Sequence, residues 1–269
     1  MAESNENVPA QKLPLENRVA IVTGSSRGIG KAIALHLASL GAKLIINYSS
    51  SNSTSLANDV VSQINSNKSM NDSIAVAVKA DISDPDEVRS LFDAAESAFQ
   101  SPVNILVNSA AVCDGKRPTI MNTDLEDFDR TFSVNTRGSF LCCKEAANRM
   151  INRGGGGRII CVTSSATASF RAGNGAYTAS KAAVEAMVKL LAKELKGTGI
   201  TANCVAPGPI ATDMFFNAAT EEKVKKVIDE CPHGRLGQSE DVAPVVGFLA
   251  SDASEWVNGQ IIRVNGGYI

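Results

Sequence analysis

The sequence predicts an α/β fold in which one parallel sheet is covered by helices on both faces. Short apolar runs alternate along the chain with amphipathic helical patterns, and no stretch resembles a linker between domains. This alternation is typical of a parallel sheet, because neighbouring parallel strands are joined by a crossing helix. The chain has 269 residues, which is long enough for a single domain with a large core.

The predicted strands are the apolar runs, and the predicted helices are segments whose apolar side chains recur three or four residues apart. The strands span 18–22, 43–47, 74–79, 104–108, 158–162, 200–205 and 261–264. The helical patterns are Ile29, Ile33, Leu37 and Leu40; Val88, Leu91, Phe92, Ala95 and Phe99; and Val242, Val245, Val246 and Leu249.

Polar segments between these elements are predicted to be loops: the serine-rich run 49–55, the stretch 65–73 and the glycines at 154–157. The segment 207–232 is long for a connection between a strand and a helix, and it carries Met and Phe side chains. We expect this segment to be a mobile flap.

Composition argues against several classes of protein. Hydrophobic residues make up 44% and charged residues 20% of the chain, as in ordinary globular proteins. The formal net charge of −2 provides no electrostatic footprint for nucleic acid, and no apolar run approaches the length of a membrane span. We therefore expect neither nucleic acid nor a membrane among the partners.

The first 17 residues are polar and carry three glutamates and one lysine. They lack the apolar core of a secretory signal and the arginine-rich, acid-poor composition of a transit peptide. We interpret residues 1–17 as a flexible polar arm and expect a cytoplasmic protein. A processed precursor is the alternative.

The six cysteines do not form a metal-binding pattern. No C-x-x-C motif occurs, and the two histidines are His36 and His233. We expect no metal site, because zinc sites need several such ligands at characteristic spacings. Cys161 and Cys204 lie in apolar strand patterns, where a reduced thiol packs as a small apolar group.

A glycine-rich stretch, 23–30, joins the first strand to the first helix. Gly24 permits a tight turn, and Gly28 and Gly30 allow the backbone to approach a phosphate and the strand closely. The start of the helix adds free N–H groups and a partial positive charge. This arrangement is typical of a dinucleotide pyrophosphate site, and it gains weight from the residues that follow.

Tyr177 and Lys181 begin a long predicted helix that runs to about Leu195. Residues four positions apart lie on the same helix face, so the phenol and the ammonium can share one site. A free phenol has a pKa of about 10, and a nearby ammonium favours the phenolate. The pair could therefore transfer a proton, although a bare Y-x-x-x-K motif is more often an ordinary surface pair.

Three further polar residues are predicted to lie beside this pair. Ser164 follows the fifth strand and precedes Tyr177 by 13 residues, and Asn108 ends the fourth strand. The carboxyl ends of parallel strands open onto the ligand crevice, so both residues are expected at its edge. Asn135 lies within a helix-like segment, where a buried amide indicates a specific purpose.

Together these motifs resemble those of the short-chain dehydrogenase/reductase family, from about Arg18 to the C-terminus. The matching motifs are T-G-x-x-x-G-I-G at 23–30, an N-x-A-type motif at 108–111, N-x-x-G at 135–138, the serine at 164, Y-x-x-x-K at 177–181, Pro207-Gly208 with Thr212, and the C-terminal Asn258-Gly259-Gln260 and Val264-Asn265-Gly266-Gly267. At 108–111 the family usually has Asn-Asn-Ala-Gly, so we expect an adjusted pocket there. The resemblance implies a three-layer, doubly wound Rossmann fold at residues 18–269, with a seven-stranded parallel sheet in one domain.

The resemblance also implies a role for each polar residue. Tyr177 would donate a proton to the carbonyl oxygen of the substrate during reduction, and Ser164 would hydrogen-bond that oxygen. Lys181 would bind the nicotinamide ribose and lower the pKa of Tyr177, and Asn135 would hold a water that links Lys181 to solvent. Ser165 is an alternative to Ser164, although the spacing to Tyr177 favours Ser164.

The end of the second strand indicates which nicotinamide cofactor is bound. Folds that select NAD place an acidic residue there, to bind the ribose 2′-hydroxyl. Here no carboxylate follows that strand before Asp59, and Arg27, Ser49 and Ser50 can bind a 2′-phosphate. We therefore favour NADPH over NADH. The alternative is an ordinary serine-rich loop with a solvated Arg27.

The resemblance extends the expected cofactor site beyond these residues, with Asp81 at the adenine ring and Ile82 beside it. The full set is Gly24, Ser26, Arg27, Gly28, Ile29, Gly30, Tyr48, Ser49, Ser50, Asp81, Ile82, Asn108, Ser109, Ala110, Tyr177, Lys181, Pro207, Gly208, Ile210 and Thr212. Five residues are weaker candidates for a substrate pocket, because such side chains more often belong to a core: Val112, Phe170, Met214, Phe215 and Phe216. They would suit a substrate with an apolar body, under a flap at 207–232.

We predict an oxidoreductase that transfers a hydride from NADPH to the carbonyl of an aldehyde or ketone. One alternative is a 3-oxoacyl-[acyl-carrier-protein] reductase, which shares the motifs but needs a basic docking surface for its acidic carrier. A non-catalytic NADPH-binding scaffold is the other, and the complete set Asn135, Ser164, Tyr177 and Lys181 argues against it. The resemblance implies a homo-oligomer, either a dimer or a tetramer.

Overall fold

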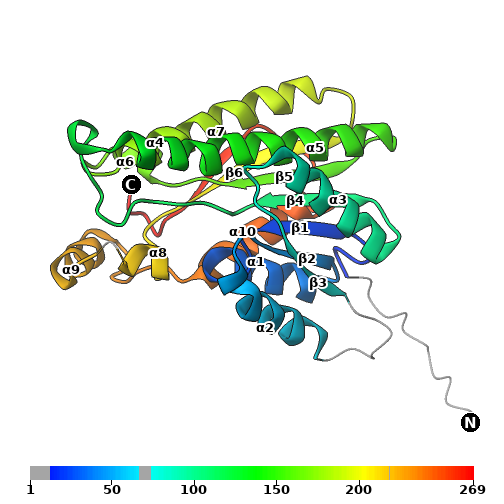
Figure 1. Cartoon of the computed structure of the whole chain (residues 1–269), viewed down its shortest axis with the longest axis horizontal. Coiled ribbons are helices and arrows are strands. Elements are labelled where there is room, and N and C mark those ends of the chain that lie inside the picture. Colours follow the sequence, from blue (N-terminus) through cyan, green and yellow to red (C-terminus); the bar gives the residue numbers. More distant parts are fainter. Residues whose placement is uncertain (1–12, 67–73, 218) are drawn as a thin grey trace, which may run out of the picture.

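The computed structural model describes residues 13–66, 74–217 and 219–269, and within them seven strands form one parallel sheet. The strand order is β3-β2-β1-β4-β5-β6-β7 (Figure 1). The strands are β1 (Val19–Thr23), β2 (Lys43–Tyr48), β3 (Ala75–Lys79), β4 (Val103–Asn108), β5 (Gly157–Val162), β6 (Ile200–Pro207) and β7 (Ile261–Val264). Every predicted strand is present, and its ends lie within two residues of the prediction.

Helices cover both faces of the sheet, which confirms the predicted three-layer, doubly wound α/β fold (Figure 1). One face is covered by α1 (Gly28–Ser39), α2 (Thr54–Asn65) and α10 (Ser239–Ala250). The other is covered by α3 (Pro85–Phe99), α5 (Ser139–Asn152) and α7 (Gly175–Glu194), and α4 (Leu125–Phe132) packs beside α7. The short helices α6 (Ala166–Ser169), α8 (Asp213–Phe216) and α9 (Glu221–Glu230) belong to the loops.

The strand order reverses at β1, which pairs with β2 on one side and with β4 on the other. The connections that leave β1 and β4 run to opposite faces of the sheet, which opens a crevice at the carboxyl ends of the strands. Thr23 joins the two sides of this crevice. Its Oγ1 accepts hydrogen bonds from the backbone N–H groups of Ser109 and Ala110, at 3.1 Å each.

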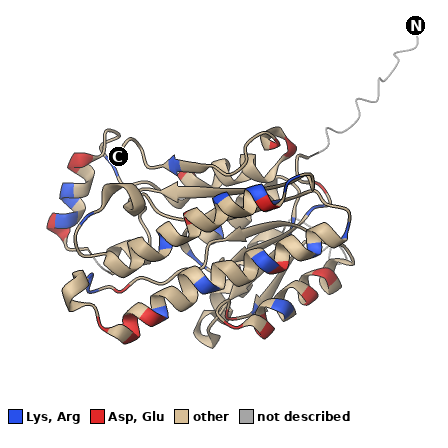
Figure 2. Ribbon diagram, turned by 90° about the horizontal axis from the view of Figure 1, so that it is seen from above, with Lys and Arg blue, Asp and Glu red and all other residues tan. Residues whose placement is uncertain are grey.

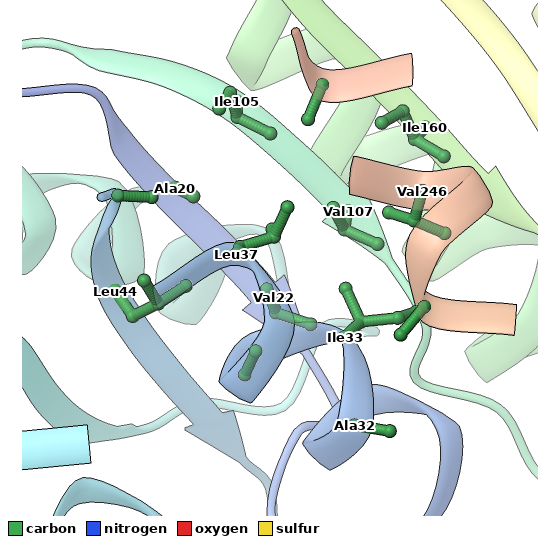
Figure 3. Packing of buried hydrophobic residues seen from close by; sticks show 14 of the residues in the cluster. Ala20, Val22, Ala32, Ile33, Leu37, Leu44, Ile105, Val107, Ile160 and Val246 are labelled. Atoms are coloured by element: carbon green, nitrogen blue, oxygen red, sulfur yellow. The ribbon is translucent and has the colours of Figure 1, made fainter. Parts of the chain in front are cut away.

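Helix α1 packs on the sheet through the apolar face that the sequence predicts. Ile33 and Leu37 are fully buried beside Val22, Val107 and Val246 (Figure 3). Burial of each large aliphatic side chain is worth about 1.5–3 kcal/mol. This packing fixes the first turn of α1, and with it the glycine-rich loop, at the mouth of the crevice.

Helix α3 begins where the sequence places a capping residue before a proline. The Asp84 carboxylate accepts hydrogen bonds from the N–H groups of Asp86 and Glu87, at 2.8 and 3.0 Å, and Pro85 needs no such partner. All five apolar residues predicted for this helix are buried against the sheet. Lys, Arg, Asp and Glu residues are interspersed along the helices (Figure 2).

The folded part of the chain begins earlier than predicted. Residues 1–12 of the predicted arm lie outside the described residues, but residues 13–17 form a turn at the end of α1. Leu15 is fully buried in the core, and its N–H donates a hydrogen bond to the Leu40 carbonyl at 2.9 Å. The arm prediction is therefore wrong for residues 13–17, because one buried leucine anchors an otherwise polar segment.

The predicted flap, 207–232, contains the helices α8 and α9, and residue 218 within it lies outside the described part of the chain. Both helices lie at the edge of the molecule that also holds the C-terminus (Figure 1). No residue of α9 is buried. The mobility of this segment stays a prediction.

Two further properties concern partners and redox state. None of the helices in 13–66, 74–217 and 219–269 is both long and apolar enough to cross a membrane. All six cysteines carry free thiols, and four of them are buried: Cys142, Cys143, Cys161 and Cys204.

Candidate active site

A cleft of about 850 Å³ occupies the crevice at the carboxyl ends of the strands. It is lined by most of the residues that the sequence assigns to a cofactor, to catalysis or to a substrate. These are Gly24, Ser26, Arg27, Gly28, Ile29, Gly30, Tyr48, Ser49, Ser50, Asp81, Ile82, Ser109, Ala110, Val112, Ser164, Tyr177, Lys181, Pro207, Gly208, Ile210, Thr212, Met214 and Phe215.

The glycine-rich loop has the close packing that a pyrophosphate cradle requires. A Cβ atom on Gly24 would lie 2.7 Å from the Cα of Ala110, and Gly24 has a φ of +62° that favours glycine. A Cβ atom on Gly30 would lie 2.4 Å from the carbonyl oxygen of Gly24. Side chains at these positions would push the loop away from the strand, so the loop fits a bound dinucleotide only with glycine.

One end of the cleft carries positive charge and hydroxyl groups. Arg27, Ser49 and Ser50 line it, and all three are exposed. At the carboxyl end of β2 lies Asn47, whose Oδ1 accepts a hydrogen bond from the Gly24 N–H at 3.2 Å. Its Nδ2 donates to the Ala80 carbonyl at 3.0 Å, so this amide ties the glycine-rich loop to two strands. No motif in the sequence indicates this role of Asn47.

The other end of the cleft holds Tyr177 and Lys181, both on the first turns of α7. Lys181 is 3% exposed, and its Nζ donates a hydrogen bond to the Val162 carbonyl at 2.8 Å. Burial lowers the pKa of Lys181 to about 8. The Nζ atom lies 5.9 Å from the centroid of the Tyr177 ring, so the predicted pairing of the two groups in one site is confirmed.

The pKa of Tyr177 moves in the direction opposite to the prediction. Burial of the phenol raises its pKa to about 12, and a hydrogen bond from Ser164 and the charge of Arg117 lower it only in part. Burial is the largest cause, and the Lys181 ammonium donates its hydrogen bond to the Val162 carbonyl. Tyr177 is therefore fully protonated near neutral pH, as a proton donor must be.

The structure distinguishes the two candidate serines. Ser164 hydrogen-bonds the phenol of Tyr177, and its Oγ also accepts a hydrogen bond from the Ala166 N–H at 3.1 Å. Ser165 instead directs its hydroxyl to the Ala206 carbonyl at 3.0 Å and is 2% exposed. This geometry favours Ser164 as the residue that meets a substrate oxygen.

Asn135 lies in a π-helical segment, Ser133–Gly138, between α4 and α5. Its side chain is fully buried and holds both backbone polar groups of one residue, Val112, in the loop after β4. Its Oδ1 accepts a hydrogen bond from the Val112 N–H at 2.8 Å, and its Nδ2 donates to the Val112 carbonyl at 2.9 Å. Asn135 does not line the cleft itself, so a link from it to Lys181 stays a prediction.

Three of the predicted site residues point elsewhere. Asn108 is 2% exposed and directs its Nδ2 to the Ser139 carbonyl at 3.4 Å, while its Oδ1 is buried without a partner. Its placement at the cofactor is wrong, because the last side chain of β4 faces the helix layer and not the cleft. Phe170 and Phe216 do not line the cleft and are 75% and 50% exposed, so both substrate assignments are wrong.

The sequence analysis did not single out several residues of the cleft wall. Cys113 and Arg117 come from the loop after β4, Asn174 from the turn before α7, and Tyr268 from the C-terminal segment. These residues carry no motif and stand in segments without periodicity. Only the tertiary structure brings them to Tyr177.

Comparison with known proteins decides the family. The family described as enoyl-(acyl carrier protein) reductase, a branch of the short-chain dehydrogenases, matches residues 24–269. The chain belongs to the short-chain dehydrogenase/reductase family. It is an oxidoreductase of that family.

Individual relatives cover almost the whole chain. It is 61% identical to the NADPH-dependent aldehyde reductase-like protein, chloroplastic, of Arabidopsis thaliana, over 99% of both chains. It is 56% identical to NADPH-dependent aldehyde reductase 2, chloroplastic, of the same plant, over 97% of both. A crystal structure of a putative gluconate dehydrogenase from Agrobacterium tumefaciens is 32% identical and has a TM-score of 0.86, over 96% of this chain and 98% of that one.

These relatives correct one expectation. Both Arabidopsis proteins are named chloroplastic, which contradicts the cytoplasmic location expected from the first 17 residues. The expectation is wrong because import signals are addresses read by receptors, and the acidic residues of this segment do not exclude one.

The two serines provide a direct test of the site. We predict that Ser164→Ala lowers kcat by roughly 10²- to 10³-fold, since it removes a hydrogen bond to the oxygen that gains charge. Ser165→Ala is the matched control and should lower the stability by about 1 kcal/mol through the lost bond to Ala206, with a much smaller effect on kcat. Steady-state kinetics and urea unfolding measure both. A larger loss of kcat in Ser165→Ala would contradict the assignment.

Proposed function

We propose that this enzyme uses NADPH to reduce the carbonyl group of a small aldehyde or ketone. The observation that carries the proposal is the composition of a single cleft. Its exposed end holds Arg27, Ser49 and Ser50, and its buried end holds Tyr177 and Lys181. The names of the two Arabidopsis relatives, both NADPH-dependent aldehyde reductases, support the same cofactor and substrate class.

The chain offers a fitting site for the adenosine phosphate of NADPH. The guanidinium of Arg27 and the hydroxyls of Ser49 and Ser50 would hold the 2′-phosphate by charge-assisted hydrogen bonds. No carboxylate stands between β2 and η1 (Ser51–Ser53) to repel that phosphate. The glycine-rich loop and the start of α1 would hold the pyrophosphate.

When bound, NADPH supplies the hydride that reduces the carbonyl carbon. Tyr177 would donate its proton to the carbonyl oxygen, and the Ser164 hydroxyl would stabilise that oxygen as negative charge develops on it. A phenol with a pKa of about 12 is protonated at every physiological pH, so the proton is always available. The nearby ammonium of Lys181 would stabilise the phenolate that remains and would hold the nicotinamide ribose.

We predict that the wild-type enzyme oxidises NADPH faster than NADH with free aldehydes or ketones, and that Arg27→Gln raises KM for NADPH by about 10- to 100-fold. The variant removes a charged contact that NADH cannot use, so KM for NADH should change little. Initial rates at varied cofactor concentration measure both values.

Arg89→Gln is the matched control, because Arg89 is an exposed arginine on α3 outside the cleft. Equal losses with both cofactors in Arg27→Gln would contradict the assignment of Arg27. A strong preference for acetoacetyl thioesters over free carbonyl compounds would move the substrate class toward acyl carriers.

The buried ammonium predicts a pH dependence. Burial lowers the pKa of Lys181 to about 8, so its charge is present below that pH and is lost as the pH rises through it. We expect kcat/KM for NADPH, which reports groups of the free enzyme, to fall above about pH 8. In Lys181→Arg the charge cannot be lost, so the reduced activity that remains should show no such fall. A fall of the same position in both enzymes would assign it to another group.

Exposed apolar side chains support the further proposal of a homo-oligomer. Phe128 on α4 is 39% exposed and Phe140 on α5 is 49% exposed, and Trp256 after α10 is 99% exposed. Large apolar side chains are enriched at interfaces between chains. Light scattering that gives the mass of a single chain at micromolar concentration would contradict an oligomer.

Two last proposals concern the cell and the flap. The chloroplastic names of both relatives support a plastid location for this enzyme, and a fluorescent fusion of the full chain that stays in the cytosol would contradict it.

Met214 and Phe215 line the cleft from α8, which supports closure of segment 207–232 over the substrate. Proteolysis of that segment should then slow when cofactor and product are both bound.

A further inference from the structure

Arg117 is an arginine of the cleft wall that the proposed reaction does not use. It lies in the loop after β4 and has a φ of +49°, in the left-handed region that residues other than glycine rarely adopt. Its N–H donates a hydrogen bond to the Asp114 carbonyl at 3.2 Å. Its carbonyl oxygen packs against Gly173, where a Cβ atom would lie only 2.9 Å away. Contacts from two loops therefore hold the backbone of Arg117 in an unfavourable conformation, which is typical of functional positions.

Among the residues that the structure describes, none forms an ion pair with the guanidinium of Arg117. Its Nε is buried without a hydrogen-bond partner. The Cζ atom of Arg117 lies 6.0 Å from the centroid of the Phe215 ring, so the guanidinium is placed over an aromatic side chain. Arg171, also in the cleft wall, differs: it forms an ion pair with Glu230, and its Cζ lies 4.8 Å over the ring of Tyr268.

The guanidinium of Arg117 lies at the end of the cleft that also holds Tyr177. Burial raises the pKa of Tyr177, of Cys113 and of Tyr268, and the positive charge of Arg117 offsets part of each rise, so it acts on three residues of the wall. Beside it, the Oδ1 of Asn174 is another buried polar atom without a partner. Buried polar groups are nearly always paired in a folded protein, so the unpaired Nε donor of Arg117 indicates a ligand that carries a hydrogen-bond acceptor. The Oδ1 of Asn174 can only accept a hydrogen bond, so it would pair with a donor group and not with an anion.

We propose that Arg117 binds the carboxylate of the substrate, so that the enzyme prefers aldehydes or ketones that carry a carboxylate over neutral carbonyl compounds. The fork of N–H donors on a guanidinium matches the two oxygens of a carboxylate. Phe215, Met214 and Val112 would contact the carbon chain between the two ends of such an oxo acid. The proposal rests on the proposed carbonyl reduction and names its substrate class.

A carboxylate suits this position better than a phosphate. Asp114 and Asp127 line the same part of the cleft. Neither forms an ion pair with Arg117 in the part of the chain that the structure describes. Their negative charges would repel a doubly charged phosphate more strongly than a singly charged carboxylate.

The test compares ω-oxo acids of increasing chain length with their methyl esters, which have the same carbonyl group but no charge. We expect wild-type kcat/KM to favour the acid at its best chain length by about 10- to 100-fold, as the loss of a charged hydrogen bond implies. In Arg117→Met this ratio should fall to about one, mainly through KM of the acid. Arg117→Lys keeps the charge but loses the fork, and its ratio should lie between those of the other two enzymes.

Arg171→Met is the matched control, and its ratio should stay within about threefold of wild type because Glu230 already neutralises Arg171. An unchanged ratio in Arg117→Met would overturn the proposal, and so would a wild-type preference for the ester. Faster turnover of an aldehyde phosphate than of the best acid would overturn the choice of a carboxylate. If the wild-type enzyme reduces neither the acid nor the ester with NADPH, the proposed carbonyl reduction itself is contradicted. The absolute rates, and not only the acid-to-ester ratio of kcat/KM, therefore have to be measured.

Discussion

The ammonium group of Lys181 is buried at the carboxyl edge of the sheet, with the Val162 carbonyl 2.8 Å away as its hydrogen-bond partner. A buried charge is costly to maintain, and burial accordingly lowers the pKa of Lys181 to about 8. The site therefore depends on holding this charge where it can act. Helix α7 supplies the lysine, β5 supplies the carbonyl, and the same helix places Tyr177 one turn earlier.

The parallel sheet explains why Tyr177 and Lys181 lie in the same cleft as the glycine-rich loop. The connections after β1 and β4 diverge, and the Oγ1 of Thr23 bonds the backbone of Ser109 and Ala110 across the gap. Buried side chains of α1 fix the glycine-rich loop on one side of that gap (Figure 3). The π-helical segment on the other side positions Val112 through Asn135. These contacts place the glycine-rich loop and Tyr177 along one cleft.

The sequence predicts the layers of the fold well, because buried parallel strands are apolar runs and helices repeat their apolar residues. It also predicts Ser164, Tyr177 and Lys181, since their spacing places them at one strand end and one helix face. It fails where direction or burial depends on neighbours. Asn108 is turned to the helix layer, Phe170 is exposed, and no local pattern indicates that a loop arginine reaches Tyr177. Such contacts arise only from tertiary packing.

Burial and the positive charge nearby act in opposite directions on the pKa of Tyr177. Removal of the phenol from water raises its pKa to about 12, so the residue keeps its proton until a substrate oxygen can take it. In the proposed reaction, Ser164 and Lys181 would stabilise the phenolate that remains.

The most direct measurement is single-turnover reduction by Tyr177→Phe, with NADPH binding followed separately by fluorescence. The account predicts a rate lower by roughly 10²- to 10⁴-fold, the usual contribution of a general acid, with NADPH affinity within about threefold of wild type. A variant that binds NADPH normally and still reduces its substrate at the wild-type rate would contradict the central role of Tyr177.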